Sequence, residues 1–69
     1  MNNYTRVQAT DLKPGDRVVR FDESTGDQSI VTLGMRKTYP GKGDYWEFYT
    51  DGEHRLGYER GMEAMRCDS

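Results

Sequence analysis

The sequence predicts a small all-β domain. Short runs rich in Val, Ile, Thr, Tyr, Phe and Trp recur along residues 1–58, and Gly, Pro and Asp separate them. No helical period continues through this stretch. With 69 residues, the chain has room for one domain with a small core. We therefore expect residues 1–69 to form a single all-β domain, with residues 1–3 and 68–69 frayed.

The first predicted strand covers residues 4–9, and its alternation points Val7 toward the core. A turn over residues 12–16 follows. Pro14 presets the backbone φ angle in this turn, and Gly15 supplies the positive φ that a type II turn requires. The chain is therefore expected to reverse direction at the Pro-Gly pair.

The second predicted strand covers residues 17–22, and a polar loop over residues 23–27 ends it. Side chains on a strand alternate between its two faces. This alternation separates two pairs of side chains, Val19 and Phe21 on one face and Val18 and Arg20 on the other.

The third predicted strand is the longest and covers residues 29–39. Val31, Leu33 and Met35 share one face, which we expect to point toward the core. Gly34 interrupts the strand, and a glycine inside a strand is typical of a bend or a β-bulge.

The fourth predicted strand covers residues 45–50. Trp46 and Phe48 lie on one of its faces and the charged Glu47 lies on the other. Because a charge is costly to bury, we expect Trp46 and Phe48 to be core residues.

The Asp-Gly pair at residues 51–52 predicts a two-residue hairpin turn into a strand over residues 54–58. Met62 and Met65 then follow at a spacing of three, which indicates a single 3₁₀ or helical turn. A short last strand over residues 64–67 can pair with an earlier strand. Two side chains of the 54–58 strand should point inward, namely Leu56 and Tyr58.

Charge and composition limit the possible partners. Twelve acidic and ten basic side chains give a net charge of -2, so no overall attraction to nucleic acid or to an anionic membrane is expected. The single Cys67 leaves no internal disulfide. The first residues lack the apolar run of a signal peptide, and no stretch approaches the ~20 apolar residues of a membrane span. We therefore expect a cytoplasmic protein without membrane contact.

Two stretches of the sequence resemble SH3-like barrels. LKPGDRVV at residues 12–19 is similar to the opening of many small bacterial barrels, and WEFYTDGEHRLGY at residues 46–58 is similar to their strand-turn-strand unit. The resemblance covers residues 10–67 and implies a small five- or six-stranded SH3-like barrel, with the 3₁₀ or helical turn near the C-terminus. The chain lacks the ALYDY-type segment of peptide-binding SH3 domains and the basic charge of KOW domains. It looks most like small phage or bacterial accessory proteins.

The sequence offers little for catalysis or for metal binding. His54 is the sole histidine, and no nucleophile stands in a recognisable motif with it. One His and one Cys fall short of a zinc site. The acidic loop at residues 22–27 resembles a calcium loop, but the position that requires a bidentate Glu is Leu33. We predict no enzyme activity, no catalytic residue, no metal site and no cofactor.

The stretch RKTYPGKGDYW at residues 36–46 gathers cations and aromatic rings around a Pro-Gly turn. If Met35 faces the core, Arg36 emerges on the outer face together with Tyr39 and Tyr45. Tyr and Arg dominate interface hot spots, and nucleic-acid bases stack on the same side chains. The predicted binding surface comprises Arg36, Lys37, Tyr39, Lys42, Tyr45, Tyr49 and Arg55.

This surface suggests two kinds of partner, and one alternative in which it binds nothing. A noncatalytic module that binds a protein partner is the first hypothesis. The second is nucleic-acid binding, with cations on phosphates and tyrosines stacked on bases. A solvated hairpin without a partner is the structural alternative. Association of the chain with itself also remains open, because exposed strand edges serve either kind of contact.

Overall fold

The computed structural model describes residues 3–52 and 54–68, and these form an all-β protein. The all-β class is confirmed, and all six strands are antiparallel to their neighbours. The elements are β1 (Tyr4–Gln8), the 3₁₀ turn η1 (Ala9–Asp11), β2 (Arg17–Phe21), β3 (Gln28–Thr38), β4 (Tyr45–Thr50), β5 (Leu56–Glu59) and β6 (Glu63–Cys67).

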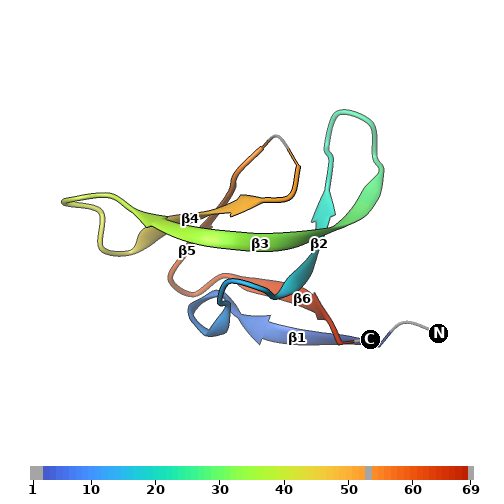
Figure 1. Ribbon diagram of the computed structural model, residues 1–69, viewed down its shortest axis with the longest axis horizontal. Coiled ribbons are helices and arrows are strands. Elements are labelled where there is room, and N and C mark those ends of the chain that lie inside the picture. The colour runs from blue at the N-terminus through green and yellow to red at the C-terminus, as the bar shows by residue number, and fades with distance from the viewer. Residues whose placement is uncertain (1–2, 53, 69) are drawn as a thin grey trace.

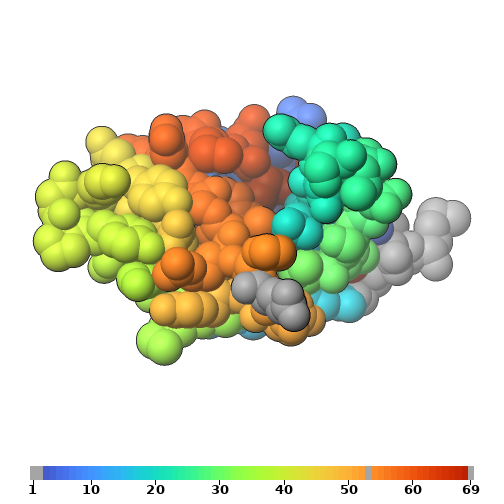
Figure 2. Space-filling model, turned by 90° about the horizontal axis from the view of Figure 1, so that it is seen from above, coloured from blue at the N-terminus to red at the C-terminus, as the bar shows by residue number. Residues whose placement is uncertain are grey.

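The strands form one sheet in the order β1-β6-β2-β3-β4-β5. Figure 1 shows that the long strand β3 joins two parts of this sheet. Its first residues pair with β2, and its last residues pair with β4. We call β1, β6, β2 and residues 28–32 of β3 the terminal half, and residues 33–38 of β3 with β4 and β5 the hairpin half. The β3–β4 turn and the β2–β3 loop lie on opposite sides of the molecule (Figure 2).

The sheet does not close into a barrel, so the expected closure is wrong. Its end strands are β1 and β5, and the described residues show no pairing between them. Side chains fill the core beside η1, where Ala9 is 1% exposed and Leu12 is 4% exposed. The Ala9 N–H donates to the Met62 carbonyl at 2.8 Å and holds η1 against the β5–β6 connection. Packing therefore covers the core without a closing strand pair.

The 3₁₀ turn lies near the N-terminus, and its prediction around Met62 and Met65 is wrong. Residues 59–62 form a β-turn, in which the Met62 N–H donates to the Glu59 carbonyl at 3.0 Å. The next residue, Glu63, already begins β6. A spacing of three also fits a turn followed by a strand, so the two methionines do not require a helix. The predicted last strand is confirmed, and it pairs with both β1 and β2.

The predicted bulge in β3 is confirmed, and it overturns the prediction for Met35. The register shifts between Leu33, which pairs with Thr50, and Arg36, which pairs with Phe48. Three steps on β3 thus oppose two on β4, and one extra residue reverses the alternation of inner and outer side chains. Leu33 is buried at 1% exposure, whereas Met35 is 70% exposed.

The two-residue turn predicted at residues 51–52 is also wrong, because the last β4–β5 pair is Phe48 with Leu56. Beyond Phe48, β4 still pairs with β3, through Thr50 and Leu33. The Asp51 N–H donates to the Thr32 carbonyl at 3.2 Å, and the Asp51 carboxylate accepts the Thr32 N–H at 3.2 Å. These bonds hold the start of the connection on β3 and make it longer than a tight hairpin turn.

The core lies between the two halves of the sheet. Trp46 and Phe48 are 5% and 0% exposed, which confirms the prediction for β4. Phe48 meets the ring of Tyr58 edge to face, with centroids 6.1 Å apart. Val7 and Leu56 pack against this cluster, as their alternation predicted.

The predicted Pro-Gly turn and the two chain ends are each held by a backbone hydrogen bond. The Asp16 N–H donates to the Lys13 carbonyl at 3.1 Å across the Pro-Gly turn, where Gly15 has a φ of 97°. The Asp68 N–H donates to the Asn3 carbonyl at 2.8 Å and ties the two ends of the described chain together. Residues 1–2 and 69, which were expected to fray, lie outside the described residues.

Candidate functional site

The outer face of the hairpin half is built on β4. Tyr45, Glu47 and Tyr49 point away from the core because they alternate with the buried Trp46 and Phe48. Glu47 pairs across the sheet with Lys37 on β3 and with Gly57 on β5, so these positions share its face.

Glu47 is the centre of this face. Its carboxylate accepts a hydrogen bond from the Tyr39 hydroxyl and another from the Tyr45 hydroxyl, the latter at 2.6 Å. The Arg55 Nε lies 3.5 Å from the same carboxylate. The Glu47 side chain is 18% exposed, compared with 42% for Arg55. Two tyrosines and one arginine therefore fix a carboxylate that is mostly shielded from solvent.

These contacts shift the acidity of the groups that make them. The hydrogen bond from Tyr39, followed by that from Tyr45, holds the pKa of Glu47 below its ordinary value. The same two bonds raise the pKa values of Tyr39 and Tyr45, because an ionised tyrosine has no proton to donate. Between the ordinary pKa of glutamate and that of tyrosine, about 4 and 10, every group is in the state that the network needs.

Two cations lie over tyrosine rings beside this network. The Lys37 Nζ is 5.3 Å from the centroid of the Tyr39 ring, and the Arg55 Cζ is 5.6 Å from that of Tyr49. The Tyr39 and Tyr45 rings are 5.9 Å apart and tilted by 34°. We call this group the tyrosine cluster, and it comprises Lys37, Tyr39, Tyr45, Glu47, Tyr49 and Arg55.

Gly57 makes room for one ring of the tyrosine cluster. A Cβ atom at this position would lie 2.6 Å from the Tyr45 hydroxyl oxygen and 3.1 Å from two ring carbons. Any other residue would therefore displace the Tyr45 ring from its place beside Glu47.

The seven predicted binding residues do not share one face. Arg36 pairs with the buried Phe48, so it points to the opposite face from Lys37. The prediction that Arg36 accompanies Tyr45 on the outer face is wrong, and the β3 bulge is the reason. Lys37, Tyr39, Tyr45, Tyr49 and Arg55 belong to the tyrosine cluster.

Arg36 and Lys42 meet at the end of the hairpin instead. Together with Arg60 and Trp46 they line a pocket of about 220 Å³, to which Tyr39 and Tyr45 also contribute. The Arg60 Nε donates to the Asp44 carboxylate at 2.8 Å. We call this the cationic pocket. It carries three basic side chains beside two rings of the tyrosine cluster.

Sequence reasoning missed Glu47 and Gly57 as members of the site. A signal for Glu47 was present, because a carboxylate flanked by tyrosines two residues away on either side shares their face. Gly57 carried no such signal. Its importance comes from a cross-strand neighbour that the sequence does not identify.

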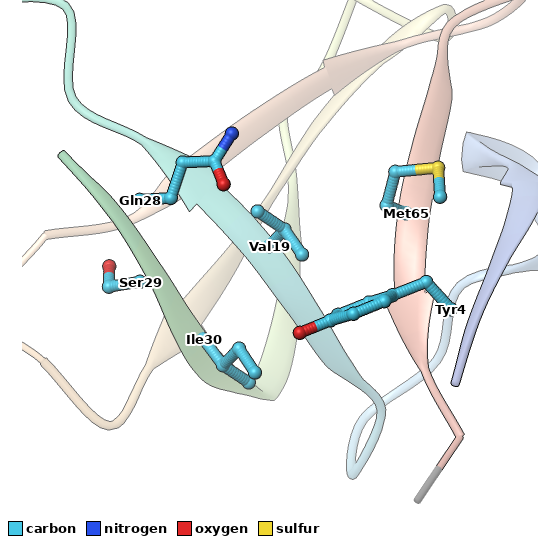
Figure 3. Close-up of a pocket in the computed structure, with 6 residues that line it drawn as sticks. All are labelled: Tyr4, Val19, Gln28, Ser29, Ile30 and Met65. Carbon is cyan, nitrogen blue, oxygen red and sulfur yellow. The ribbon is translucent and has the colours of Figure 1, made fainter. Parts of the chain in front are cut away.

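A second surface lies on the outer face of the terminal half. Four strands line a groove of about 570 Å³. In Figure 3 the Tyr4 hydroxyl lies between Val19 and Ile30. Sequence reasoning placed Val19 and Phe21 on one face but did not assign that face to the core or to solvent. The lining residues are Tyr4, Val19, Gln28, Ser29, Ile30 and Met65.

The groups considered for acid-base and metal chemistry lie in different parts of the fold, with His54 in the β4–β5 connection and Cys67 on β6 opposite Tyr4. His54 is exposed, and its backbone carbonyl accepts a hydrogen bond from the Thr50 hydroxyl at 2.6 Å. Its neighbour Glu53, which was judged poorly placed to orient it, is outside the described residues. In the part of the chain that the structure describes, no three His, Cys, Asp or Glu side chains gather as a metal site.

Comparison with protein-family models, with curated proteins and with solved structures finds no match for this chain. In residues 3–52 and 54–68, no helix has the length and apolar character needed to cross a bilayer.

Proposed function

We propose that this protein is a noncatalytic binding module, and that the tyrosine cluster contacts a protein partner. The observation that carries the proposal is the Glu47 network, which holds two tyrosines and an arginine in place on an exposed sheet face. Tyr and Arg contribute most often to interface hot spots. Side chains that are already ordered lose less conformational entropy when a partner binds. The tyrosine cluster therefore suits binding better than a mobile surface would.

The charge pattern supports a partner of mixed charge. Lys37 and Arg55 lie above rings, while Glu47 lies between them. An interface of this kind gains selectivity from matching charges and contact area from the rings. As part of the same proposal, the module acts as an accessory protein of the bacterial or phage type that its turns and strands resemble.

Nucleic acid is the second candidate, and the cationic pocket favours it. Arg36, Lys42 and Arg60 could contact phosphates while the neighbouring Tyr39 or Tyr45 stacks on a base. The net charge of -2 opposes long-range attraction, so binding would depend on this pocket.

A capture experiment with and without nuclease tests the proposal. The double variant Tyr49→Ala, Arg55→Ala removes exposed members of the tyrosine cluster. The control is Asp11→Ala, Lys13→Ala, which changes two exposed residues outside the tyrosine cluster and the cationic pocket. We expect a defined protein that is retained after nuclease, bound by the control and lost by the double variant. Purified, that protein should bind with an affinity that depends weakly on salt.

Two results would replace the proposal. Retention that disappears with nuclease, and weakens log-linearly as salt rises, would identify a nucleic-acid reader. Loss of that retention in Arg36→Ala, Lys42→Ala would assign it to the cationic pocket. Equal capture by the double variant and by wild type would show that the tyrosine cluster is only a solvated surface.

A further inference from the structure

The outer face of the terminal half carries exposed apolar side chains among charged ones, which include Arg6 beside Met65 and Glu63 at the start of β6. Tyr4, Ile30 and Met65 are 43%, 39% and 38% exposed, and Phe21 at the end of β2 is 57% exposed. Val19 pairs with Ile30 at the centre of this face. An antiparallel sheet with one solvated side normally alternates apolar and polar residues. Here both sides carry apolar side chains, because Val18 and Val31 fill the core on the other side.

We propose that this face is the interface through which two copies of the chain associate. The first argument is shape. The groove and its ridge lie on the same surface, since the Tyr4 ring projects from the β1 edge toward Val19 and Ile30 (Figure 3). A two-fold symmetric contact requires a surface that complements itself. A ridge beside a groove meets that requirement, because each Tyr4 can enter the groove of the other copy.

The second argument is charge. Asp22, Glu23 and Asp27 follow Phe21 at one end of the face, and Glu63 begins β6 at that same end. Arg17 lies at the opposite end of β2, beside Cys67, and Arg6 lies between the two ends, beside Met65. The acids around this end are already bonded: the carboxylates of Asp16 and Asp51 accept backbone N–H bonds from Lys13 and Thr32, and that of Asp68 accepts from the Thr5 hydroxyl and Arg66 Nε.

A half-turn about an axis across the strands would place Arg17 of one copy over the acidic end of the other. The face therefore carries its own complement in charge as well as in shape. A second copy necessarily carries both the basic end and the acidic end, so each end of the face meets the opposite charge. We therefore assign the face to a second copy.

The third argument is the size of the contact, which determines the expected affinity of the dimer. Four strands of about five residues give an outline of about 19 by 17 Å, from strand spacings of ~4.8 Å and rises of ~3.3 Å. With side-chain relief, each copy would bury on the order of 500 Å², compared with ~800 Å² in a standard interface. The contact is therefore a reversible dimer that separates on dilution.

Such a dimer leaves the tyrosine cluster accessible, because the cluster belongs to the hairpin half. Each dimer would then present two copies of it. Linked sites bind a repeated partner more tightly than single sites do. This consequence rests on the proposed function, whereas the dimer itself does not.

Sedimentation equilibrium over a wide concentration range tests the interface. Wild type should pass from monomer to dimer as concentration rises. Ile30→Glu places a charge at the centre of the face and should raise the dissociation constant at least ~tenfold. The control is Met35→Glu, which changes the most exposed methionine on the hairpin half and should dimerise like wild type.

A charge exchange tests the orientation of the two copies. Arg17→Glu should weaken the dimer, and Arg17→Glu combined with Glu63→Arg should restore part of the loss. Because both residues are exposed, this pair also serves if Ile30→Glu fails to fold. A wild-type monomer at every concentration, or a folded Ile30→Glu variant that dimerises like wild type, would overturn the proposal.

Discussion

The two halves of the sheet expose opposite kinds of surface. On the hairpin half, outward side chains bond to one another around Glu47, and their apolar rings are covered by cations. On the terminal half, the outward positions include Val19, Ile30 and Met65, which have no polar group to pair and lie among charged residues such as Arg6 and Glu63. The polar groups of the first surface bond to one another within the monomer, whereas the second surface leaves apolar side chains exposed to solvent. We propose a protein partner for the first surface and a second copy of the chain for the other.

The largest expected effect comes from the core that both halves share. Phe48→Ala removes a ring that is 0% exposed and should lower the free energy of unfolding by about 3–5 kcal/mol. In a domain of this size that loss leaves little native protein. Urea denaturation followed by Trp46 fluorescence measures it. The neighbouring Tyr49→Ala, on the exposed face, should cost far less; equal losses would contradict the assignment of faces on β4.

Gly57→Ala should disturb the hairpin half alone. The new Cβ would displace the Tyr45 ring from Glu47, so the pKa of Tyr45 should fall toward its ordinary value. Stability should drop by a small fraction of the Phe48→Ala effect, because the ring can move outward. Ultraviolet titration of the tyrosines measures the pKa. Gly43→Ala, which meets nothing within 4 Å, is the control, and an unchanged titration in Gly57→Ala would contradict the packing.

Stability should depend on pH through Glu47 in a defined direction. The pKa of Glu47 is lowered by folding, so its contribution is present above the ordinary pKa of glutamate and is lost as pH falls through the folded value. The tyrosine pKa values are raised, so their contribution is present below about 10 and is lost as pH rises further.

Glu47→Gln should therefore flatten the pH dependence of unfolding at both ends. The acid-side decline would not vanish, because the Ser24 hydroxyl lowers the pKa of Asp22 and the Thr5 hydroxyl lowers that of Asp68. Urea midpoints of wild type and Glu47→Gln across pH isolate the difference. Parallel curves would contradict the Glu47 network.

The smallest expected effect is at Trp46. Its Nε1 is buried and has no hydrogen-bond acceptor within the described residues. Trp46→Phe keeps a ring in the core and removes a donor whose burial without a partner costs about 1–3 kcal/mol. Loss of ring volume opposes this gain, so the net change should be within about 1 kcal/mol. A loss of several kcal/mol in urea denaturation would indicate that Nε1 has a partner in solution.

Local signals predicted much of the hairpin half. The boundaries of β4 were predicted as residues 45–50 and are confirmed, because alternation and buried aromatic residues act within a few positions. The Asp-Gly pair misled, since Asp51 bonds to Thr32 on a strand that lies far from it in sequence. The tyrosine cluster was predicted in part, but Arg36 was placed on the wrong side and Glu47 was not included.

The terminal half was less predictable, although its strands were correctly located. Alternation separated Val18 from Val19, but both are apolar, so the pattern did not identify which one faces the core. The structure buries Val18 completely and leaves Val19 half-buried beside the groove. That choice depends on how β2 packs between β3 and β6, and β6 is distant from β2 in the chain.

The sequence by itself determined the all-β class, the Pro-Gly turn, the bulge at Gly34 and the burial of Trp46 and Phe48. Each of these follows from backbone preference or from alternation over a few residues. Tertiary structure decided that the sheet stays open, that Arg36 leaves the tyrosine cluster and that Glu47 lies at its centre. For Arg36 the physical reason is register, because one extra residue in β3 reverses every later side chain on that strand. The open sheet and the contacts of Glu47 depend on which strands and side chains meet across the sheet, which alternation along one strand does not specify.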